Sequence, residues 1–339
     1  MNYNSIEREL NAIGVSCKKE TPIAPYTTFR IGGNADLLCL IDSLPQLHDA
    51  ILICKKHKIP FKVLGGGSNV LVSDKGFRGV IIINKAKGWE ILEDAEIADL
   101  KGQTLHRHEA SETIRPLQEG QEKIVVRVAS GMKVPALMNA LFAEDISGLE
   151  LFAGIPATVG GAVYMNMHGA KLFFGDLLAQ AQILTADNEV HNVSQEYFQF
   201  DYDYSILHET KETVLSCDLV LTKGQSAEAK ALAKEWIQKK KIQPQRSAGC
   251  LFQNLTQEQQ KQLGYPTPSI GYVIDKVLGL KGKTFDGAKI SESHAAFIEN
   301  IGGATANDVL FLINEIKKQM LLKTGIALQT EVEFVGEMN

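Results

Sequence analysis

Short apolar runs alternate with helical repeats along the chain. Continuous apolar runs predict buried strands at residues 37–41, 79–84, 123–129 and 214–221, and a hairpin across residues 181–193. Apolar positions at helical spacing predict helices at residues 5–13, 44–58, 134–145, 226–241, 269–277 and 304–323. Residues 329–335 are expected to form a last strand. The order of strand, helix and strand near the N-terminus indicates a compact unit of mixed helix and sheet.

The most distinctive pattern lies in residues 61–72, where two apolar runs flank the loop Gly65-Gly66-Gly67-Ser68-Asn69. Glycine has no Cβ, so such a loop can adopt positive φ and approach another group closely. Its successive N–H groups can bind an anion, phosphate above all, although an ordinary tight turn has the same composition. Because a strand and not a helix is expected after the loop, it is neither a Rossmann nor a Walker loop, and neither motif occurs in the chain.

A second notable stretch, residues 148–166, is rich in small side chains and contains one charged residue, Glu150. Small residues let a flat ligand or a helix N-terminus approach the backbone closely. Close packing of a helix on a sheet has the same requirement, so both interpretations stay open.

Composition and charge exclude several classes of protein. The 339 residues are enough for two or three domains, and 45% hydrophobic with 22% charged residues is typical of a globular protein. A net charge of -5 argues against a general nucleic-acid binder. Residues 1–20 are polar and no apolar run reaches membrane-spanning length, so we expect neither a secretory signal nor a membrane span. These features predict a cytoplasmic protein.

The cysteines and histidines predict no metal centre. The five cysteines are scattered and show no C-x-x-C spacing, so neither a disulfide framework nor a structural zinc site is expected. Residues 85–122 contain histidines and acidic residues, but these lack a regular ligand spacing. A solvated insertion is therefore expected there.

Several short segments follow one another in a diagnostic order. They are residues 28–33 (TFRIGG), 63–69 (VLGGGSN), 154–162 (GIPATVGGA) with Asn166, 247–254 (SAGCLFQN), 287–297 (GAKISESHAAF) and 331–332 (EV). With these segments the chain resembles the UDP-N-acetylenolpyruvoylglucosamine reductase family from residue 28 to residue 337. The short connection between residues 205 and 250 is similar to that of the family's type II members.

The resemblance implies an α+β fold with a two-lobed FAD-binding part of the vanillyl-alcohol-oxidase type and a C-terminal α/β substrate-binding domain. The expected boundaries are residues 1–60 for the first lobe, which the final strand at 329–339 joins, residues 61–222 for the second lobe with the insertion at 85–122, and residues 223–328 for the substrate-binding domain. A monomer is expected.

The resemblance also implies the ligands and the residues that contact them. Non-covalent FAD would be bound by Arg30, Gly32, Gly65, Gly66, Gly67, Ser68, Asn69, Gly154, Ile155, Pro156, Gly160, Gly161 and Ala162. The substrate, UDP-N-acetylglucosamine enolpyruvate, would be bound by Tyr202, Lys241, Arg246 and Asn254. NADPH would reduce the flavin, and no metal is implied.

The implied reaction converts the enolpyruvyl ether to UDP-N-acetylmuramate, for peptidoglycan synthesis. The flavin N5 passes a hydride to the vinyl carbon, and a general acid then protonates the neighbouring carbon. Cys250 occupies the position of the usual serine proton donor, and a thiol is the stronger acid; a buried inert thiol is the alternative. Glu331 matches the carboxylate that assists at the enolate, with Glu333 as the competing candidate.

The chain departs from the family pattern in two places. The usual Phe-x-Tyr-Arg-x-Ser reads Phe200-Asp201-Tyr202-Asp203-Tyr204-Ser205, so Asp203 replaces the arginine that polarises the substrate carboxylate. Arg246 or the lysines at 239–241 are candidates to compensate. The second departure is the stretch at residues 166–171. His168 in this stretch is expected to be structural, with contact to flavin or substrate as the alternative. These departures leave open a flavin oxidoreductase with another substrate, or a silent flavin- or sugar-nucleotide-binding protein.

Overall fold

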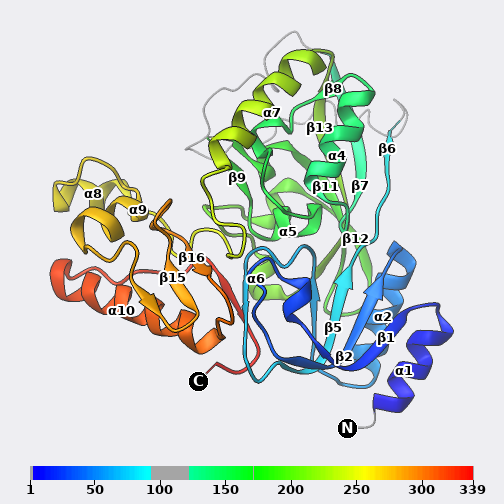
Figure 1. Cartoon of the computed structure of the whole chain (residues 1–339). Helices are drawn as coiled ribbons and strands as arrows, with labels where there is room; N and C mark the ends of the chain where they lie inside the picture. Colours follow the sequence, from blue (N-terminus) through cyan, green and yellow to red (C-terminus); the bar gives the residue numbers. More distant parts are fainter. Residues whose placement is uncertain (1–2, 93–121, 171, 339) are drawn as a thin grey trace. The chain divides into compact units, whose positions relative to one another are not determined.

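The computed structural model describes residues 3–92, 122–170 and 172–338. The chain forms two compact units, which we call unit 1 and unit 2. Unit 1 consists of residues 1–17, 39–66 and 82–240, and unit 2 consists of residues 18–38, 67–81 and 241–339. Figure 1 shows how the elements follow one another along the chain. The domain boundaries inferred from the family resemblance stay a prediction.

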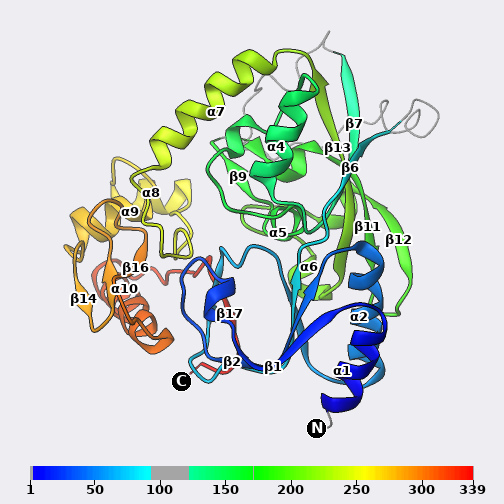
Figure 2. The same cartoon turned by 45° about the vertical axis from the view of Figure 1, so that its right-hand side comes forward.

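A four-stranded sheet contains the first strands of the chain. Its order is β1 (Ser16–Pro22), β2 (Asn34–Ile41), β5 (Phe77–Asn84) and β3 (Phe61–Leu64). The boundary between the units falls within β1, β2 and β5. Helix α2 (Leu44–Lys56) begins after Ser43, whose Oγ accepts a hydrogen bond from the amide of Gln46 at 3.4 Å. Helix α1 (Tyr3–Ala12) packs against α2 and buries Ile6 and Leu10 (Figure 2).

The main sheet of unit 1 is antiparallel and six-stranded. Along the sheet its strands are β12 (Val190–Ser194), β11 (Leu178–Leu184), β13 (Thr213–Lys223), β7 (Lys123–Ala129) and β6 (Trp89–Ile91), while β8 (Ile146–Ser147) pairs with β13. Because side chains alternate along a strand, Cys217 and Leu219 of β13 enter the hydrophobic core, whereas Ser216 and Asp218 lie on the other face. Helices α4 (Val134–Ala143), α5 (Val159–Tyr164) and α7 (Ser226–Lys240) contribute to this core.

Shorter elements connect these parts of unit 1. They are η3 (Glu150–Phe152), β9 (His168–Gly169), β10 (Leu172–Phe173), η4 (Phe174–Leu177), η5 (Gln195–Phe198) and α6 (Leu207–Thr210). Strands β9 and β10 pair with each other, so that Phe173 lies opposite His168.

Unit 2 is built around the long helix α10 (Ala306–Thr324), which packs against a three-stranded sheet. The sheet consists of β14 (Thr284–Phe285), β15 (Ala288–Ile290) and β16 (Ile298–Asn300). The remaining elements are η1 (Ala24–Tyr26), the pair β4 (Val70–Val72) and β17 (Glu333–Val335), α8 (Gln257–Leu263), α9 (Ile270–Tyr272) and the π-helix η6 (Val273–Val277). The carboxylate of Asp74 accepts hydrogen bonds from the first amides of α10, those of Ala306 and Asn307.

The predicted helices and strands are found with small shifts at their ends, and three details differ. The final strand, predicted at 329–335, is limited to residues 333–335 and pairs in parallel with β4 at residues 70–72. The helix predicted at 269–277 is α9 followed by a π-helix. The predicted insertion at 85–122 contains β6, which is part of the main sheet, and its residues 93–121 lie outside the described part of the chain.

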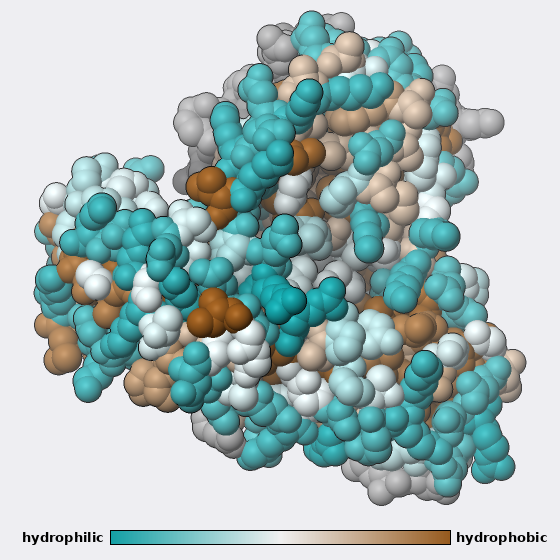
Figure 3. Space-filling model, in the orientation of Figure 1, coloured by the Kyte–Doolittle hydropathy of each residue, from teal (hydrophilic) through white to brown (hydrophobic). Residues whose placement is uncertain are grey.

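The surface view in Figure 3 shows polar residues interspersed with smaller apolar groups. Among the described residues, no helix is both long and apolar enough to cross a membrane. The described residues also contain no group of three or more His, Cys, Asp or Glu side chains that could hold a metal ion.

Candidate functional site

The glycine loop connects β3 to β4, as the sequence predicts, and its first glycine is required by close packing inside unit 1. A Cβ at Gly65 would lie 2.1 Å from Oγ1 of Thr158. Thr158 precedes α5, and its Oγ1 accepts a hydrogen bond from the amide of Gly161 at 3.4 Å. The structure therefore brings together Gly65 and Gly161, two of the residues predicted to bind the cofactor. The sequence analysis missed Thr158, although a threonine three residues before Gly161 is a typical helix-capping position.

Gly67 of the same loop belongs to unit 2 and makes its close contacts there. Gly67 has a φ of +59°, and a Cβ there would lie 2.2 Å from the carbonyl oxygen of Tyr26. The amide of Thr28 donates to the carbonyl of Gly67 at 3.0 Å. The segment at 28–33 and the glycine loop are far apart in the sequence, but a backbone hydrogen bond between Thr28 and Gly67 joins them. The exposed Arg30 donates from its guanidinium to the carbonyl of Pro25, which fixes the side chain beside this turn.

The two predicted catalytic residues lie on neighbouring segments of unit 2. The amide of Glu331 donates to the carbonyl of Leu251 at 3.0 Å, and Phe252 forms a β-bridge with Thr330. Cys250, the residue before Leu251, is half-buried. This bridge places Glu331 opposite Leu251, the residue that follows Cys250, and the side-chain amide of Asn69 donates to the carbonyl of Glu331 at 3.2 Å.

The backbone of the competing residue, Glu333, pairs with the end of the glycine loop and with β4. Its amide donates to the carbonyl of Asn69 at 3.0 Å, and in the β4–β17 pair it lies opposite Val70. Asn69 of the glycine loop therefore binds the backbone of both glutamates, and the backbone bond to Leu251, next to Cys250, is made by Glu331. The choice between the two carboxylates stays a prediction.

The residues predicted to bind substrate fall into both units. Lys241 and Arg246 of unit 2 are exposed. Asn254, also in unit 2, accepts a hydrogen bond from the amide of Ile270 through its Oδ1 at 3.0 Å, so this oxygen already supports the start of α9. Tyr202 of unit 1 is half-buried, and its ring centroid lies 5.0 Å from that of His168.

The two departures from the family pattern contact each other in unit 1. Nδ1 of His168 lies 3.3 Å from Oδ1 of Asp203, and the carboxylate of Asp203 is almost completely buried, with 4% of the side chain exposed. Asp203 has a φ of +53°, a backbone conformation that is uncommon outside glycine. Its second oxygen, Oδ2, is buried and has no hydrogen-bond partner among the described residues. This pair is compatible with a structural His168 and with the alternative in which the histidine contacts a ligand, so both interpretations stay open.

A buried cation lies beside the second predicted cofactor loop. A Cβ at Gly154 would lie 3.1 Å from Cδ of Lys240, the last residue of α7. The Nζ of Lys240 is buried and has no hydrogen-bond partner among the described residues. Burial lowers the pKa of Lys240 from 10.5 to about 8. The residue predicted from the sequence was the neighbouring Lys241, because spacing along the chain does not reveal which lysine of the run is buried.

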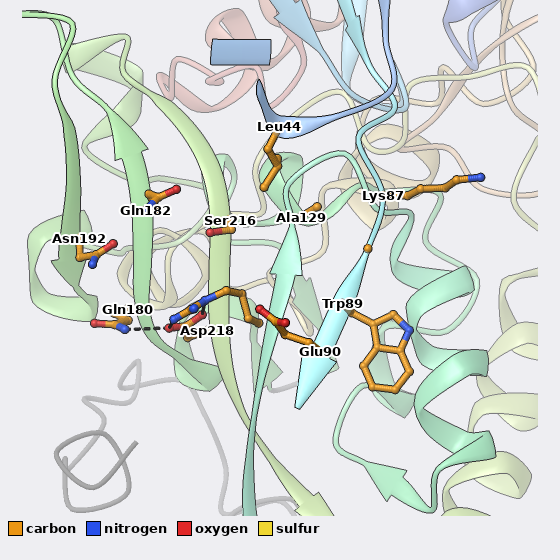
Figure 4. Close-up of a pocket in the computed structure, with 12 residues that line it drawn as sticks. Leu44, Lys87, Trp89, Glu90, Ala129, Gln180, Gln182, Asn192, Ser216 and Asp218 are labelled. Atoms are coloured by element: carbon orange, nitrogen blue, oxygen red, sulfur yellow. Dashed lines mark hydrogen bonds and ion pairs between the residues drawn. The ribbon is translucent and has the colours of Figure 1, made fainter. Parts of the chain in front are cut away.

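A separate pocket of about 460 Å³ lies on the polar face of the main sheet of unit 1. Figure 4 shows Gln180 and Asp218 on neighbouring strands in its wall. Nε and Nη2 of Arg127 donate to the two carboxylate oxygens of Asp218 at 2.8 and 2.9 Å, and Nε2 of Gln180 donates to Oδ2 at 2.7 Å. The side chains of Arg127, Asp218 and Gln180 thus form their hydrogen bonds with one another. We therefore interpret the pocket as a stabilised polar surface and not as a reaction centre.

Comparison with known proteins identifies the family. Residues 241–335 match the model described as UDP-N-acetylenolpyruvoylglucosamine reductase, C-terminal domain, and residues 35–194 match an FAD binding domain. UDP-N-acetylenolpyruvoylglucosamine reductase of Anoxybacillus flavithermus is 35% identical over 338 residues, 98% of each chain. The Bacillus subtilis protein of the same name is 36% identical, covering 93% of this chain and 92% of its own.

A solved structure agrees with these matches. The crystal structure of UDP-N-acetylenolpyruvylglucosamine reductase from Thermus caldophilus superposes with a TM-score of 0.68 at 28% identity, covering 95% of this chain and 98% of that chain. The predicted fold class, an α+β FAD-binding fold followed by a C-terminal domain, is thereby confirmed. The chain belongs to the UDP-N-acetylenolpyruvoylglucosamine reductase family.

Proposed function

We propose that the chain uses FAD and NADPH to reduce the enolpyruvyl ether of UDP-N-acetylglucosamine to UDP-N-acetylmuramate, as a cytoplasmic monomer. The family membership supports the reaction class. The observation that carries the proposal is the hydrogen bond between the amide of Glu331 and the carbonyl of Leu251, because it sets the candidate acid and the candidate carboxylate on adjacent segments.

The described residues fit an anionic dinucleotide such as FAD. The buried Nζ of Lys240 has no protein partner among them, which suits a phosphate or diphosphate oxygen. The glycine loop at 65–69 and the loop at 154–156 would supply backbone N–H groups and close approach. When bound, FAD would supply the hydride that the reaction needs.

In this proposal, Cys250 donates the proton to the substrate carbon next to the site of hydride addition. Its half-buried position allows contact with a ligand while limiting exchange with bulk water. Glu331 assists at the enolate, where negative charge develops, by holding and orienting a proton. A positioned general acid commonly contributes roughly a hundred- to ten-thousand-fold in rate.

We further propose that His168 takes the place of the missing arginine at the substrate carboxylate. The carboxylate of Asp203 lies 3.3 Å from Nδ1 and orients the ring, so that the second ring nitrogen, Nε2, is available to the substrate carboxylate. Phe173 and Tyr202 lie against the ring and restrict its orientation. This arrangement makes His168 a better candidate than the exposed Arg246.

The test is a pair of half-reactions under anaerobic conditions. NADPH should bleach the bound flavin, and the enolpyruvyl sugar nucleotide should then restore its absorbance with formation of UDP-N-acetylmuramate. Bleaching without reoxidation by this substrate would contradict the proposal.

The buried Asp203 favours one alternative, an FAD oxidoreductase of the same fold that acts on a substrate without a carboxylate. A buried carboxylate oxygen without a partner would repel an anionic group and attract a donor. That enzyme would leave the enolpyruvyl sugar nucleotide unreduced but would reoxidise its flavin with oxygen or with another acceptor.

A further inference from the structure

Three cysteines that are far apart in the sequence lie close to one another in unit 1. The Sγ atoms of Cys17, in β1, and Cys39, in β2, are 2.7 Å apart. Both thiols are free, Cys17 is partly exposed and Cys39 is fully buried. Cys54 of α2 is also buried, and burial, with a smaller contribution from Cys17, raises its pKa to about 12.

We propose that Cys17 and Cys39 are a modification site at which a reversible disulfide forms. Strands β1 and β2 are neighbours in the four-stranded sheet, so the two side chains are held face to face by the backbone pairing. A disulfide has an S–S distance of about 2.05 Å, so the two sulfur atoms need to approach by only about 0.7 Å. This juxtaposition carries the proposal, and it does not depend on the proposed enzymatic function.

The exposure of the two thiols fixes the order of the steps. The hydrogen bond with Cys17 and burial raise the pKa of Cys39, so Cys39 is a poor first nucleophile. The Cys17 thiolate would attack a small-molecule disulfide such as oxidised glutathione, forming a mixed disulfide and releasing one molecule of reduced thiol. The Cys39 sulfur would then attack the sulfur of Cys17, lose its proton and release the second thiol. Two protein thiols are oxidised, and one disulfide reagent is reduced to two thiols.

The position of the pair gives the disulfide a structural consequence. Cys17 is the last residue of unit 1 before the chain enters unit 2, and Cys39 is the first residue after its return. The disulfide would therefore link the two ends of the segment 18–38, which contains Arg30 and Gly32. Cross-linking the ends of a segment restricts the unfolded chain and raises the unfolding temperature.

The experiment exposes the full-length, folded protein to oxidised glutathione, blocks the remaining thiols by alkylation and maps the peptides by mass spectrometry. The expected product is lighter by two hydrogen atoms, contains Cys17 joined to Cys39, and unfolds several degrees higher than the reduced protein. Dithiothreitol should restore both thiols and the original unfolding temperature. Cys17→Ser should abolish the change, whereas the matched variant Cys54→Ala should retain it.

Three results would overturn the proposal: glutathione that stays on Cys17 while Cys39 is alkylated, a link between Cys17 and Cys54, or both thiols remaining free. The wild-type peptide map distinguishes them even if a variant folds poorly.

Discussion

Nδ1 of His168 lies 3.3 Å from Oδ1 of Asp203, and these residues belong to the two segments in which the sequence departs from the expected family pattern. The two departures are therefore in contact with each other. Asp203 is buried behind the imidazole, while 31% of the His168 side chain is exposed. A buried carboxylate next to a more exposed histidine is the arrangement expected if the carboxylate orients the histidine toward a ligand.

The first prediction concerns His168. His168→Gln should slow the reoxidation of reduced flavin by the enolpyruvyl sugar nucleotide by roughly a hundred- to a thousand-fold, because the positioned group at the substrate carboxylate is lost. Flavin reduction by NADPH should be unchanged. Stopped-flow absorbance measures the two steps separately.

A matched control for this variant is His191→Gln. Nε2 of His191 lies 2.9 Å from Glu189, so this variant also removes a histidine from a carboxylate pair, but at an exposed position. Its half-reactions should equal those of the wild type. Equal rates for His168→Gln and His191→Gln would refute the assignment.

The second prediction concerns Cys250. Cys250→Ala should lower the rate of substrate-dependent flavin reoxidation by roughly a hundred- to ten-thousand-fold, because the proton donor is removed. Cys250→Ser keeps a donor and should retain most of the rate. If the alanine and serine variants were equally active, Cys250 would be a structural thiol.

The third prediction concerns the contact between Gly65 and Thr158. Gly65→Ala should destabilise the protein by about 1–3 kcal/mol, since the new methyl group has no space beside Oγ1 of Thr158. Thermal unfolding should shift downward by several degrees. Gly161→Ala is the control, because its Cβ would meet Oγ1 of Thr158 only at 3.4 Å, a normal contact.

A double-mutant cycle locates the cause of this destabilisation. Thr158→Ala alone should lose the helix cap, at about 0.5–2 kcal/mol. The double variant Gly65→Ala/Thr158→Ala should be more stable than the sum of the single effects predicts, because the clashing oxygen is gone. Strict additivity would show that the contact does not limit position 65.

The fourth prediction is a pH dependence that originates from Lys240. The folded-state pKa, about 8, is below the value of 10.5 for an exposed lysine, so the unliganded folded protein disfavours the charged form. Below pH 8 the lysine is protonated in both states, and burial of the charge opposes folding. As the pH rises from about 8 to 10.5 the folded protein loses this proton first, so its stability relative to Lys240→Met should increase.

Anion binding should show the opposite trend. The affinity for FAD or for UDP should fall as the pH rises above about 8, because the ammonium is lost. At pH 7, Lys240→Met should weaken binding of one of these two ligands by roughly ten-fold or more, as expected for a hydrogen bond to a charged group. Isothermal titration can measure both ligands, with the exposed neighbour in Lys241→Met as the control. A larger loss for Lys241→Met would restore the original choice of Lys241.

Patterns in the amino-acid sequence were enough to predict the order of helices and strands, the position of the glycine loop between two strands, and the family. These properties depend on local spacing: a helix repeats every 3.6 residues and a strand every two, and loop glycines mark backbone conformations that other residues avoid. The predicted helix at 44–58 and the strand at 123–129 were therefore found almost unchanged, as α2 and β7.

Which side chains contact one another depends on the folding of distant segments onto each other. His168 and Asp203, Cys17 and Cys39, and Lys240 and Gly154 are each separated by many residues, and strand pairing or helix packing brings them together. The same is true of burial: Lys240 and Lys241 are equivalent in the sequence, but one packs on a glycine and the other faces solvent. The lowered pKa of Lys240 follows from its burial in the surrounding protein, which no local sequence pattern records.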